Sequence, residues 1–448
     1  MKRIYSITAI FISLFLCLNL TINCYASEKK IDNWPSGPNV SSDSAIIMEA
    51  STGAILYEKN IDKQQYPASI TKIMTTLLAI EKCSMDETVT FSKEAVFGIE
   101  RNSSHIARDV GEQLTMEQCL YAIMLESANE VSAAVAEHIG GSNEGFAKIM
   151  NAKAKELGCK NTHFNNPHGL PDENHYTSAY DMALIAKAAI SNNTFKTIIG
   201  TKRYTLPQTN KNDECYYLNN HHKMLQEALH YDGCEGGKTG YTTVAGATLV
   251  TFAKRGDLEL ICVVMKTSGT QHYEDTKALF DYAFENFEKY NIAENETNFT
   301  NNPQNTTSNS NSIFGDYETF ISLNENDCVV LPKSSKFADA IPSLNYNNKD
   351  ADVLATLSYH YNKHFVGSTT VKLVEKSKKD NFNFDSDSNL KSNKTKSSSL
   401  KINIFKILKL VFFFIIIILI LLIIIYICNL PKLRRRRRRK YNKRRRHR

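Results

Sequence analysis

Strand-like patterns of apolar and polar positions occur at two places far apart in the sequence. Residues 44–59, SAIIMEASTGAILYEK, read as a strand, a tight turn at residues 51–53 and a returning strand. Residues 246–265, GATLVTFAKRGDLELICVVM, read as a hairpin that turns at Gly256 and Asp257. The sequence therefore predicts two hairpins.

Between these hairpins the apolar residues recur at helical spacing. Those of residues 70–78 follow Pro67, a common entry to a helix, and predict a helix that Ser69 opens. Further helices are predicted at residues 114–125, 130–141, 145–158 and 272–289. A sheet formed from both ends of the region, with helices inserted between them, makes residues 27–290 one α+β domain with a substantial core.

The segments beyond residue 290 differ in composition from this domain. Residues 291–315 are rich in Asn, Thr and Ser and read as a flexible linker. Residues 316–375 contain short alternating runs such as DVLATLSYHY, which predict a small all-β domain. A second polar linker follows at residues 376–400.

The N-terminus has the layout of a secretory signal peptide. Lys2 and Arg3 precede an apolar run from Ile4 to Leu20, and Ala26 ends a segment suited to cleavage. A retained membrane anchor fits less well because the run is short, and the residues before Cys24 fit a lipobox poorly. Residues 1–26 are therefore expected to be removed on export.

The C-terminus has the pattern of a membrane anchor with a basic tail. Leu410 to Cys428 is nineteen residues without a charge, long enough to span a bilayer and without the polar face of a core helix. We therefore expect residues 401–428 to form a transmembrane anchor and the basic residues 429–448 to stay in the cytoplasm. Together with the signal peptide, this orientation places the rest of the chain outside the cell.

The distribution of charge argues against a nucleic-acid partner. Residues 429–448 hold 13 of the 54 Lys and Arg residues and no acid, so the remaining chain has 41 basic and 47 acidic residues, a net charge of −6. The positive charge is thus a property of the tail, which is expected to fix the topology and to contact anionic lipid headgroups.

The ten cysteines predict neither a disulfide framework nor a zinc site. Cys17 and Cys24 lie in the signal region and Cys428 in the apolar segment, which leaves seven, an odd number. These seven run from Cys83 to Cys328 without Cys-x-x-Cys spacing. No metal and no cofactor is expected.

Ser69 and Lys72 are candidates for a nucleophile and its base. They are three residues apart at the start of the predicted helix and so share one face. A lysine among apolar residues is costly unless it has a function or a partner, and a desolvated lysine can take a proton from a hydroxyl. The same spacing begins at Ser27 and at Ser398, so this motif alone favours an ordinary helix start with an outward lysine.

Two more polar motifs fall at places suited to a cleft. Ser127 and Asn129 lie between two predicted helices, where they can face a ligand or simply cap a helix. Lys238, Thr239 and Gly240 lie on a strand that enters the second hairpin. The lysine and the threonine suit a carboxylate, and the glycine lets a ligand approach the backbone. An ordinary strand-edge lysine and turn is the alternative for this last motif.

The order and setting of the three motifs resemble those of one known family. Ser-x-x-Lys on a helix start, Ser-x-Asn between helices and Lys-Thr-Gly on a strand are the set found in penicillin-recognising serine enzymes. The stretches MLESANEVSAAVAEHIGGS, HFNNPHGLPDENHYTSAYDMALIAKAA and GGKTGYTTVAGATLV resemble the D-alanyl-D-alanine carboxypeptidases, the low-molecular-weight penicillin-binding proteins. The resemblance covers roughly residues 35–290 and implies a β-lactamase/transpeptidase-like domain, an antiparallel sheet flanked by helices.

The resemblance implies a serine peptidase that acts on peptidoglycan stem peptides ending in D-Ala-D-Ala. Ser69 would be the nucleophile, Lys72 the base, and Ser127 a relay of protons to the leaving amine. Attack on the carbonyl of the penultimate residue releases the last D-Ala, and water then frees the enzyme. A β-lactam imitates the dipeptide and acylates the same serine.

The same resemblance assigns substrate-binding roles. Asn129 would hold the substrate amide, and Lys238 and Thr239, next to Gly240, would bind the terminal carboxylate. The backbone N–H groups of the nucleophilic serine and of Tyr241 would form the oxyanion hole, which stabilises the charge that develops on the attacked carbonyl.

Two alternatives compete with the carboxypeptidase interpretation. A serine β-lactamase uses the same scaffold, but Ala128 stands where those enzymes usually carry Asp, and no Glu-x-x-Leu-Asn stretch follows Ser127. A non-catalytic cell-wall-binding anchor would not need the intact nucleophile and its lysines.

Overall fold

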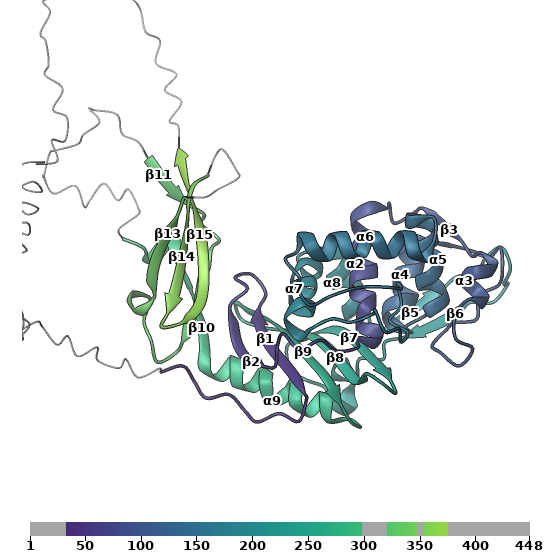
Figure 1. Cartoon of the computed structure of the whole chain (residues 1–448), viewed down its shortest axis with the longest axis horizontal. Helices are drawn as coiled ribbons and strands as arrows, with labels where there is room; N and C mark the ends of the chain where they lie inside the picture. Colours follow the sequence, from purple (N-terminus) through teal and green to yellow (C-terminus); the bar gives the residue numbers. More distant parts are fainter. Residues whose placement is uncertain (1–32, 298–319, 347–352, 375–448) are drawn as a thin grey trace, which may run out of the picture. The chain divides into compact units, whose positions relative to one another are not determined.

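The computed structural model describes residues 33–297, 320–346 and 353–374, and its centre is a five-stranded antiparallel sheet (Figure 1). The strand order is β2-β1-β9-β8-β7. These strands are β1 (Ser44–Glu49), β2 (Ile55–Lys59), β7 (Cys234–Thr242), β8 (Gly246–Arg255) and β9 (Leu258–Thr267). Both predicted hairpins are confirmed, and the segments from the two ends of the region pair directly through β1 and β9.

Both faces of this sheet are covered, because successive side chains of a strand point to opposite faces. In β1, Ile46 and Met48 face one core, whereas Ala45 and Ile47 face another. Helix α9 (Gln271–Asn286) covers the second face, and α7 with α2 lies over the first (Figure 1). The central strands therefore have no polar face, which matches their nearly continuous apolar sequence.

The helices between the hairpins form the part of the domain above the first face. Their bounds are α2 (Lys72–Lys82), α3 (Lys93–Phe97), α4 (Met116–Leu125), α5 (Asn129–Gly140), α6 (Asn143–Glu156), α7 (Ala179–Ile190) and α8 (Asn193–Gly200). Two short hairpin sheets border them, β3 (Thr88–Thr90) with β4 (Gln113–Thr115) and β5 (Arg203–Leu206) with β6 (Tyr216–Asn219). The helices predicted at residues 114–125, 130–141 and 145–158 are thus confirmed.

The helix that Ser69 was expected to open begins three residues later. Residues Ala68–Thr71 form a turn of 3-10 helix (η1), and α2 starts at Lys72. Ala68 has a φ of 52°, and the Lys72 N–H bonds to the Ser69 carbonyl three residues back. The Thr71 hydroxyl donates to the Ala68 carbonyl at 2.9 Å, a local bond that competes with regular α-helix.

The helix predicted at residues 272–289 also ends early. After Asn286 the chain is extended and forms β10 (Phe287–Asn291), which pairs with β12 (Cys328–Pro332). Residues 292–295, within the stretch predicted as a linker, form the short helix α10 (Ile292–Asn295) with Ile292 buried. Pairing with a distant strand therefore overrides the helical spacing of Phe287.

A second antiparallel sheet contains the strands beyond residue 319. Its order is β10-β12-β15-β14-β13, and β11 also pairs with β15. The remaining bounds are β11 (Phe320–Leu323), β13 (Ile341–Asn345), β14 (Val353–Tyr361) and β15 (His364–Val374). Alternate residues of β14, among them Leu357 and Tyr359, form a separate apolar cluster.

Several expectations concern residues outside the described part of the chain. These are the signal peptide at 1–26, most of the linker at 291–315, the linker at 376–400, the transmembrane anchor at 401–428 and the basic tail at 429–448. Among the helices that the structure does describe, none is both long and apolar enough to cross a membrane.

Candidate active site

A cleft of about 700 Å³ brings the three sequence motifs together at one end of β7. Its lining includes Ser69, Ser127, Asn129, Thr239, Gly240 and Tyr241. These residues come from η1, from the break between α4 and α5, and from an edge strand of the central sheet. The candidate residues thus meet although they are far apart in the sequence.

Lys72 lies beneath this cleft and is fully buried. Its Nζ lies 3.1 Å from Ser69 Oγ. It also donates to Asn129 Oδ1 and to the carbonyl of His168, both at 2.6 Å. The outward lysine that the motif alone allowed is therefore excluded.

The surroundings of Lys72 favour its neutral form. Burial lowers the pKa of Lys72 well below its ordinary value, and the positive charge of Lys238 lowers it further, while the Glu130 carboxylate acts in the opposite direction. The amine next to the Ser69 hydroxyl is therefore a better proton acceptor than a solvated lysine.

The segment from His163 to His175 completes the lysine's surroundings, which the sequence motifs did not reveal. The His168 carbonyl is an acceptor for Lys72, and the next residue, Gly169, has a φ of 89°. A Cβ on Gly169 would lie 1.9 Å from the Ala68 carbonyl oxygen, so only glycine fits here. A His-Gly pair in a polar stretch is the only sequence signal for this contact, and it does not identify the partner.

The break between α4 and α5 holds Ser127 in a special backbone conformation. Ser127 has a φ of 61°, and neither Ser127 nor Asn129 caps α5, whose N-cap is Ala128. Among the described residues the Ser127 hydroxyl has no hydrogen-bond partner, and it lines the cleft. The Asn129 N–H donates to the carbonyl of Ser104 at 2.9 Å, and this bond connects the start of α5 to another segment that lines the cleft.

Strand β7 passes very close to the Ser69 turn. A Cβ on Gly240 would lie 2.8 Å from the Ser69 nitrogen and 2.4 Å from Thr248 Oγ1. Thr248 is itself fixed, because its hydroxyl donates to the Pro67 carbonyl at 2.9 Å. Glycine at this position therefore sets the distance between the strand and the nucleophile's backbone N–H.

Lys238 lies on the same strand and is also buried. Its Nζ donates to the Thr239 carbonyl at 3.0 Å. Burial lowers the pKa of Lys238 to about 7, although the Glu126 carboxylate acts to raise it. Glu126 is held by the Asn219 N–H at 2.6 Å and by His221 at 3.0 Å. Lys238 therefore changes charge close to neutral pH.

The pKa of Lys238 predicts an alkaline limb in the pH profile. The kcat/KM for a peptide with a free C-terminal carboxylate should fall above about pH 7, because Lys238 in the free enzyme loses the charge that attracts the carboxylate. Lys238→Ala should lower kcat/KM at neutral pH and remove this limb, which a rate profile between pH 6 and 10 measures. An unchanged limb in Lys238→Ala would assign the titration to another group.

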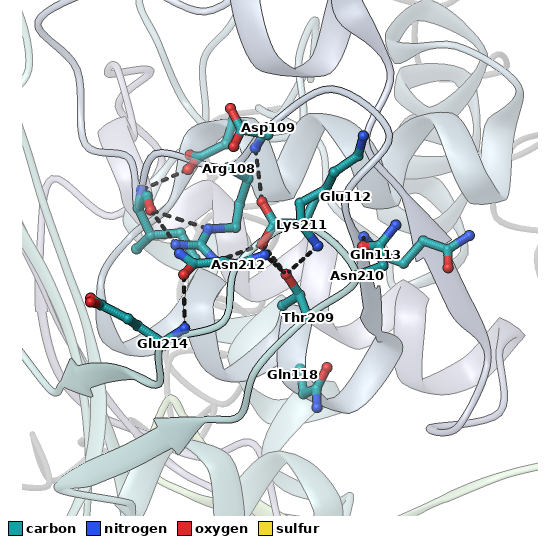
Figure 2. A network of polar contacts seen from close by, with 12 residues as sticks. Arg108, Asp109, Glu112, Gln113, Gln118, Thr209, Asn210, Lys211, Asn212 and Glu214 are labelled. Carbon is teal, nitrogen blue, oxygen red and sulfur yellow. Dashed lines mark hydrogen bonds and ion pairs between the residues drawn. The ribbon is translucent and has the colours of Figure 1, made fainter.

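A buried polar network joins the loop at residues 108–112 to the loop between β5 and β6 (Figure 2). Arg108 Nη1 pairs with Glu112 Oε1 at 2.8 Å, and both side chains are buried. The same carboxylate accepts from Thr209 Oγ1 at 2.8 Å, and Asn210 Nδ2 donates to the Gly111 carbonyl at 2.9 Å. The first of these loops follows Ser104, which lines the cleft, by only four residues in the sequence.

Among the described residues, metal-ligand side chains cluster outside the cleft. Within the described ranges, the cleft contains no group of three His, Cys, Asp or Glu side chains whose ligand atoms approach one another closely enough. The groups that the motifs bring to the cleft are the Ser69, Ser127 and Thr239 hydroxyls, the Asn129 amide, the buried amines of Lys72 and Lys238 and backbone N–H groups.

Comparison with known proteins connects this geometry to one family. The sequence profile of the D-alanyl-D-alanine carboxypeptidases matches residues 31–269. The chain is 40% identical over 254 residues to the D-alanyl-D-alanine carboxypeptidase DacF of Bacillus subtilis, an alignment that covers 55% of this chain and 63% of DacF. It is 32% identical over 318 residues to DacA of Escherichia coli, covering 68% of this chain and 74% of DacA.

The fold is similar to that of a solved penicillin-binding protein. Penicillin-binding protein 5 of Haemophilus influenzae superposes with a TM-score of 0.62 at 26% sequence identity. The match covers 76% of this chain and 98% of that structure. It therefore extends beyond the part of the chain that the family profile matches.

Proposed function

The chain belongs to the D-alanyl-D-alanine carboxypeptidase family, and we propose that it removes the terminal D-Ala from peptidoglycan stem peptides ending in D-Ala-D-Ala. The observation that carries this proposal is the buried Lys72 amine 3.1 Å from Ser69 Oγ. A serine hydroxyl is a weak nucleophile and needs a base within reach, and this lysine is the base that lies there.

The contacts of Lys72 give the proton transfer a direction. A neutral amine has two N–H bonds and one lone pair, and the oxygens of Asn129 and His168 accept both N–H bonds at 2.6 Å. The lone pair is then left for the Ser69 hydroxyl. Ser69 Oγ attacks the carbonyl carbon of the penultimate D-Ala as its proton passes to Lys72.

The remaining roles are those that the family resemblance implies, and the positions around the cleft support them. Ser127 relays the proton to the departing D-Ala amine, and Asn129 holds the substrate amide. Lys238 and Thr239 bind the terminal carboxylate. The N–H groups of the nucleophile and of Tyr241 stabilise the oxyanion, a function that the close approach at Gly240 supports. Water then hydrolyses the acyl-enzyme.

Penicillin and a D-Ala-D-Ala peptide together test this function. We expect penicillin to leave a persistent adduct that maps to Ser69 by mass spectrometry, and the peptide to release D-alanine. The adduct persists because the sequence has no counterpart of the glutamate motif that deacylates class A β-lactamases. Rapid repeated hydrolysis of penicillin without release of D-alanine would favour a β-lactamase. A protein that neither reacts with penicillin nor releases D-alanine would favour a wall-binding anchor.

We further propose that residues 316–375 act as a small all-β domain. We also propose that the chain is exported, anchored by residues 401–428 and oriented with its basic tail in the cytoplasm. Protease added to intact cells should then remove the domain that contains Ser69 but spare an epitope placed after Arg448. Deletion of residues 401–448 should release an active protein into the medium. Cleavage of the epitope by the external protease would contradict the proposed orientation.

A further inference from the structure

Three possible metal ligands meet at a place remote from the cleft. The Cys83 thiol, the Glu87 carboxylate and the His138 imidazole each offer an atom, and these atoms all lie within 4.8 Å of one another. Cys83 ends α2, Glu87 lies in the turn before β3, and His138 lies in the last turn of α5. A sulfur, an oxygen and a nitrogen ligand thus come close together from three separate elements of the fold.

The backbone around this cluster is fixed by hydrogen bonds. The Ser84 N–H donates to Glu87 Oε1 at 2.6 Å, while Glu87 Oε2 lies 2.9 Å from His138 Nε2. One carboxylate oxygen is therefore oriented by an amide and the other is directed at the imidazole, as in metal sites whose outer hydrogen bonds orient a ligand. The Cys83 N–H bonds to the Ala79 carbonyl at 3.0 Å, which fixes the third ligand at the helix end.

We propose that Cys83, Glu87 and His138 form a binding site for a zinc ion, with water as the fourth ligand. One sulfur, one nitrogen and one oxygen are ligands that Zn²⁺ accepts in tetrahedral geometry. All three side chains are partly exposed, so an ion can reach them from solvent. In the structure the Glu87–His138 contact occupies this place, and an ion between the two would replace it.

Zinc binding here requires a proton to leave the thiol. Burial, together with the neighbouring Glu87 carboxylate, raises the pKa of Cys83 to about 11, so the metal-free side chain is a thiol at neutral pH. The metal–sulfur bond forms as this proton is released to solvent. No sequence motif indicates the site, because His138 reaches Cys83 only through the packing of α5 near α2.

The position of the site suggests a structural use. Helices α2 and α5 carry Lys72 and Asn129 at their N-termini, which are joined by a 2.6 Å hydrogen bond. Their C-terminal ends carry Cys83 and His138. An ion would therefore connect the two helices at the ends opposite the cleft, without taking part in the reaction.

Cobalt provides a direct test with the full-length protein in detergent. Co²⁺ should bind one to one and produce a sulfur-to-cobalt charge-transfer absorption, and Zn²⁺ should displace it. Cys83→Ser should abolish the absorption, and His138→Gln should weaken binding at least about 10-fold, since loss of a ligand exceeds the 10–100-fold cost of losing an outer contact. Cys215→Ser, which removes an exposed thiol, should bind like the unaltered protein.

Two results would contradict the proposed zinc site. One is the absence of charge-transfer absorption in the unaltered protein, and the other is an absorption that survives in Cys83→Ser. Circular dichroism of both ligand variants checks their folding, and the two substitutions lie in separate elements, so one misfolded variant leaves the other informative. Penicillin acylation measured on the same samples reports on Ser69 and is expected to persist in both variants, which separates this site from the proposed enzymatic function.

Discussion

Lys72→Ala is expected to lose nearly all acylation of Ser69 while the protein stays folded. The substitution removes the only amine within hydrogen-bonding distance of the Ser69 hydroxyl among the described residues, and general-base contributions are typically about 10²–10⁴-fold. Loss of one member of a nucleophile–base unit can cost more than this. The rate at which a penicillin adduct accumulates, followed by intact-protein mass spectrometry, measures the effect.

A lysine on the same helix provides the matched control. Lys82 lies in the last turn of α2 and is exposed, so Lys82→Ala removes the same side chain from the same helix without touching the cleft. We expect acylation at the unaltered rate in this variant. Near-normal acylation in Lys72→Ala, with Lys82→Ala unaffected, would show that another group accepts the serine proton.

Gly240→Ala is expected to reduce acylation about 10²–10³-fold, the typical effect of losing one oxyanion-hole donor. The added Cβ would lie 2.8 Å from the Ser69 nitrogen, so β7 and the Ser69 turn must move apart. That movement separates the backbone N–H groups of Ser69 and Tyr241, which must converge on one oxygen. Second-order acylation rate constants with penicillin, measured for folded protein, test this expectation.

Thr248→Ala separates the two contacts that the new methyl group would make. It removes the hydroxyl that would lie 2.4 Å from the added Cβ, while the added Cβ would still meet the Ser69 nitrogen. It also removes the hydrogen bond to the Pro67 carbonyl, so Thr248→Ala alone is the control. Combining it with Gly240→Ala should therefore not restore acylation. Full recovery in the double variant would mean that crowding against Thr248, and not the position of Ser69, causes the loss.

The sequence predicted the elements of the domain well where the apolar pattern was local. Both hairpins and the helices at residues 114–158 follow from patterns within single segments. The end of α9 did not, because Phe287 pairs with Pro332, a partner that helical spacing cannot reveal. The start of α2 was also misplaced, because Ala68 has a positive φ and packs against Gly169, neither of which the apolar spacing of residues 70–78 indicates.

In the candidate site, too, the sequence predicted some features and missed others. Ser69, Lys72, Ser127 and Lys238 were found because their residue types are specific and their motifs occur in a characteristic order. The His168 carbonyl was not found, because a backbone acceptor has no residue signature. Likewise, the sequence placed Lys238 at a carboxylate but contained nothing about its burial, which sets its pKa near 7.

The two buried amines also affect the stability of the fold. Lys238 has a pKa of about 7 in the folded protein and an ordinary value of 10.5, so between these values the unfolded chain holds a proton that the folded chain has released. The free energy of unfolding therefore rises with pH across this window, and below pH 7 the folded protein carries the full cost of a buried charge. Lys72, whose pKa is also well lowered, adds a cost of the same sign. The cleft is thus maintained at the expense of thermodynamic stability, and the large apolar core on both faces of the sheet offsets it.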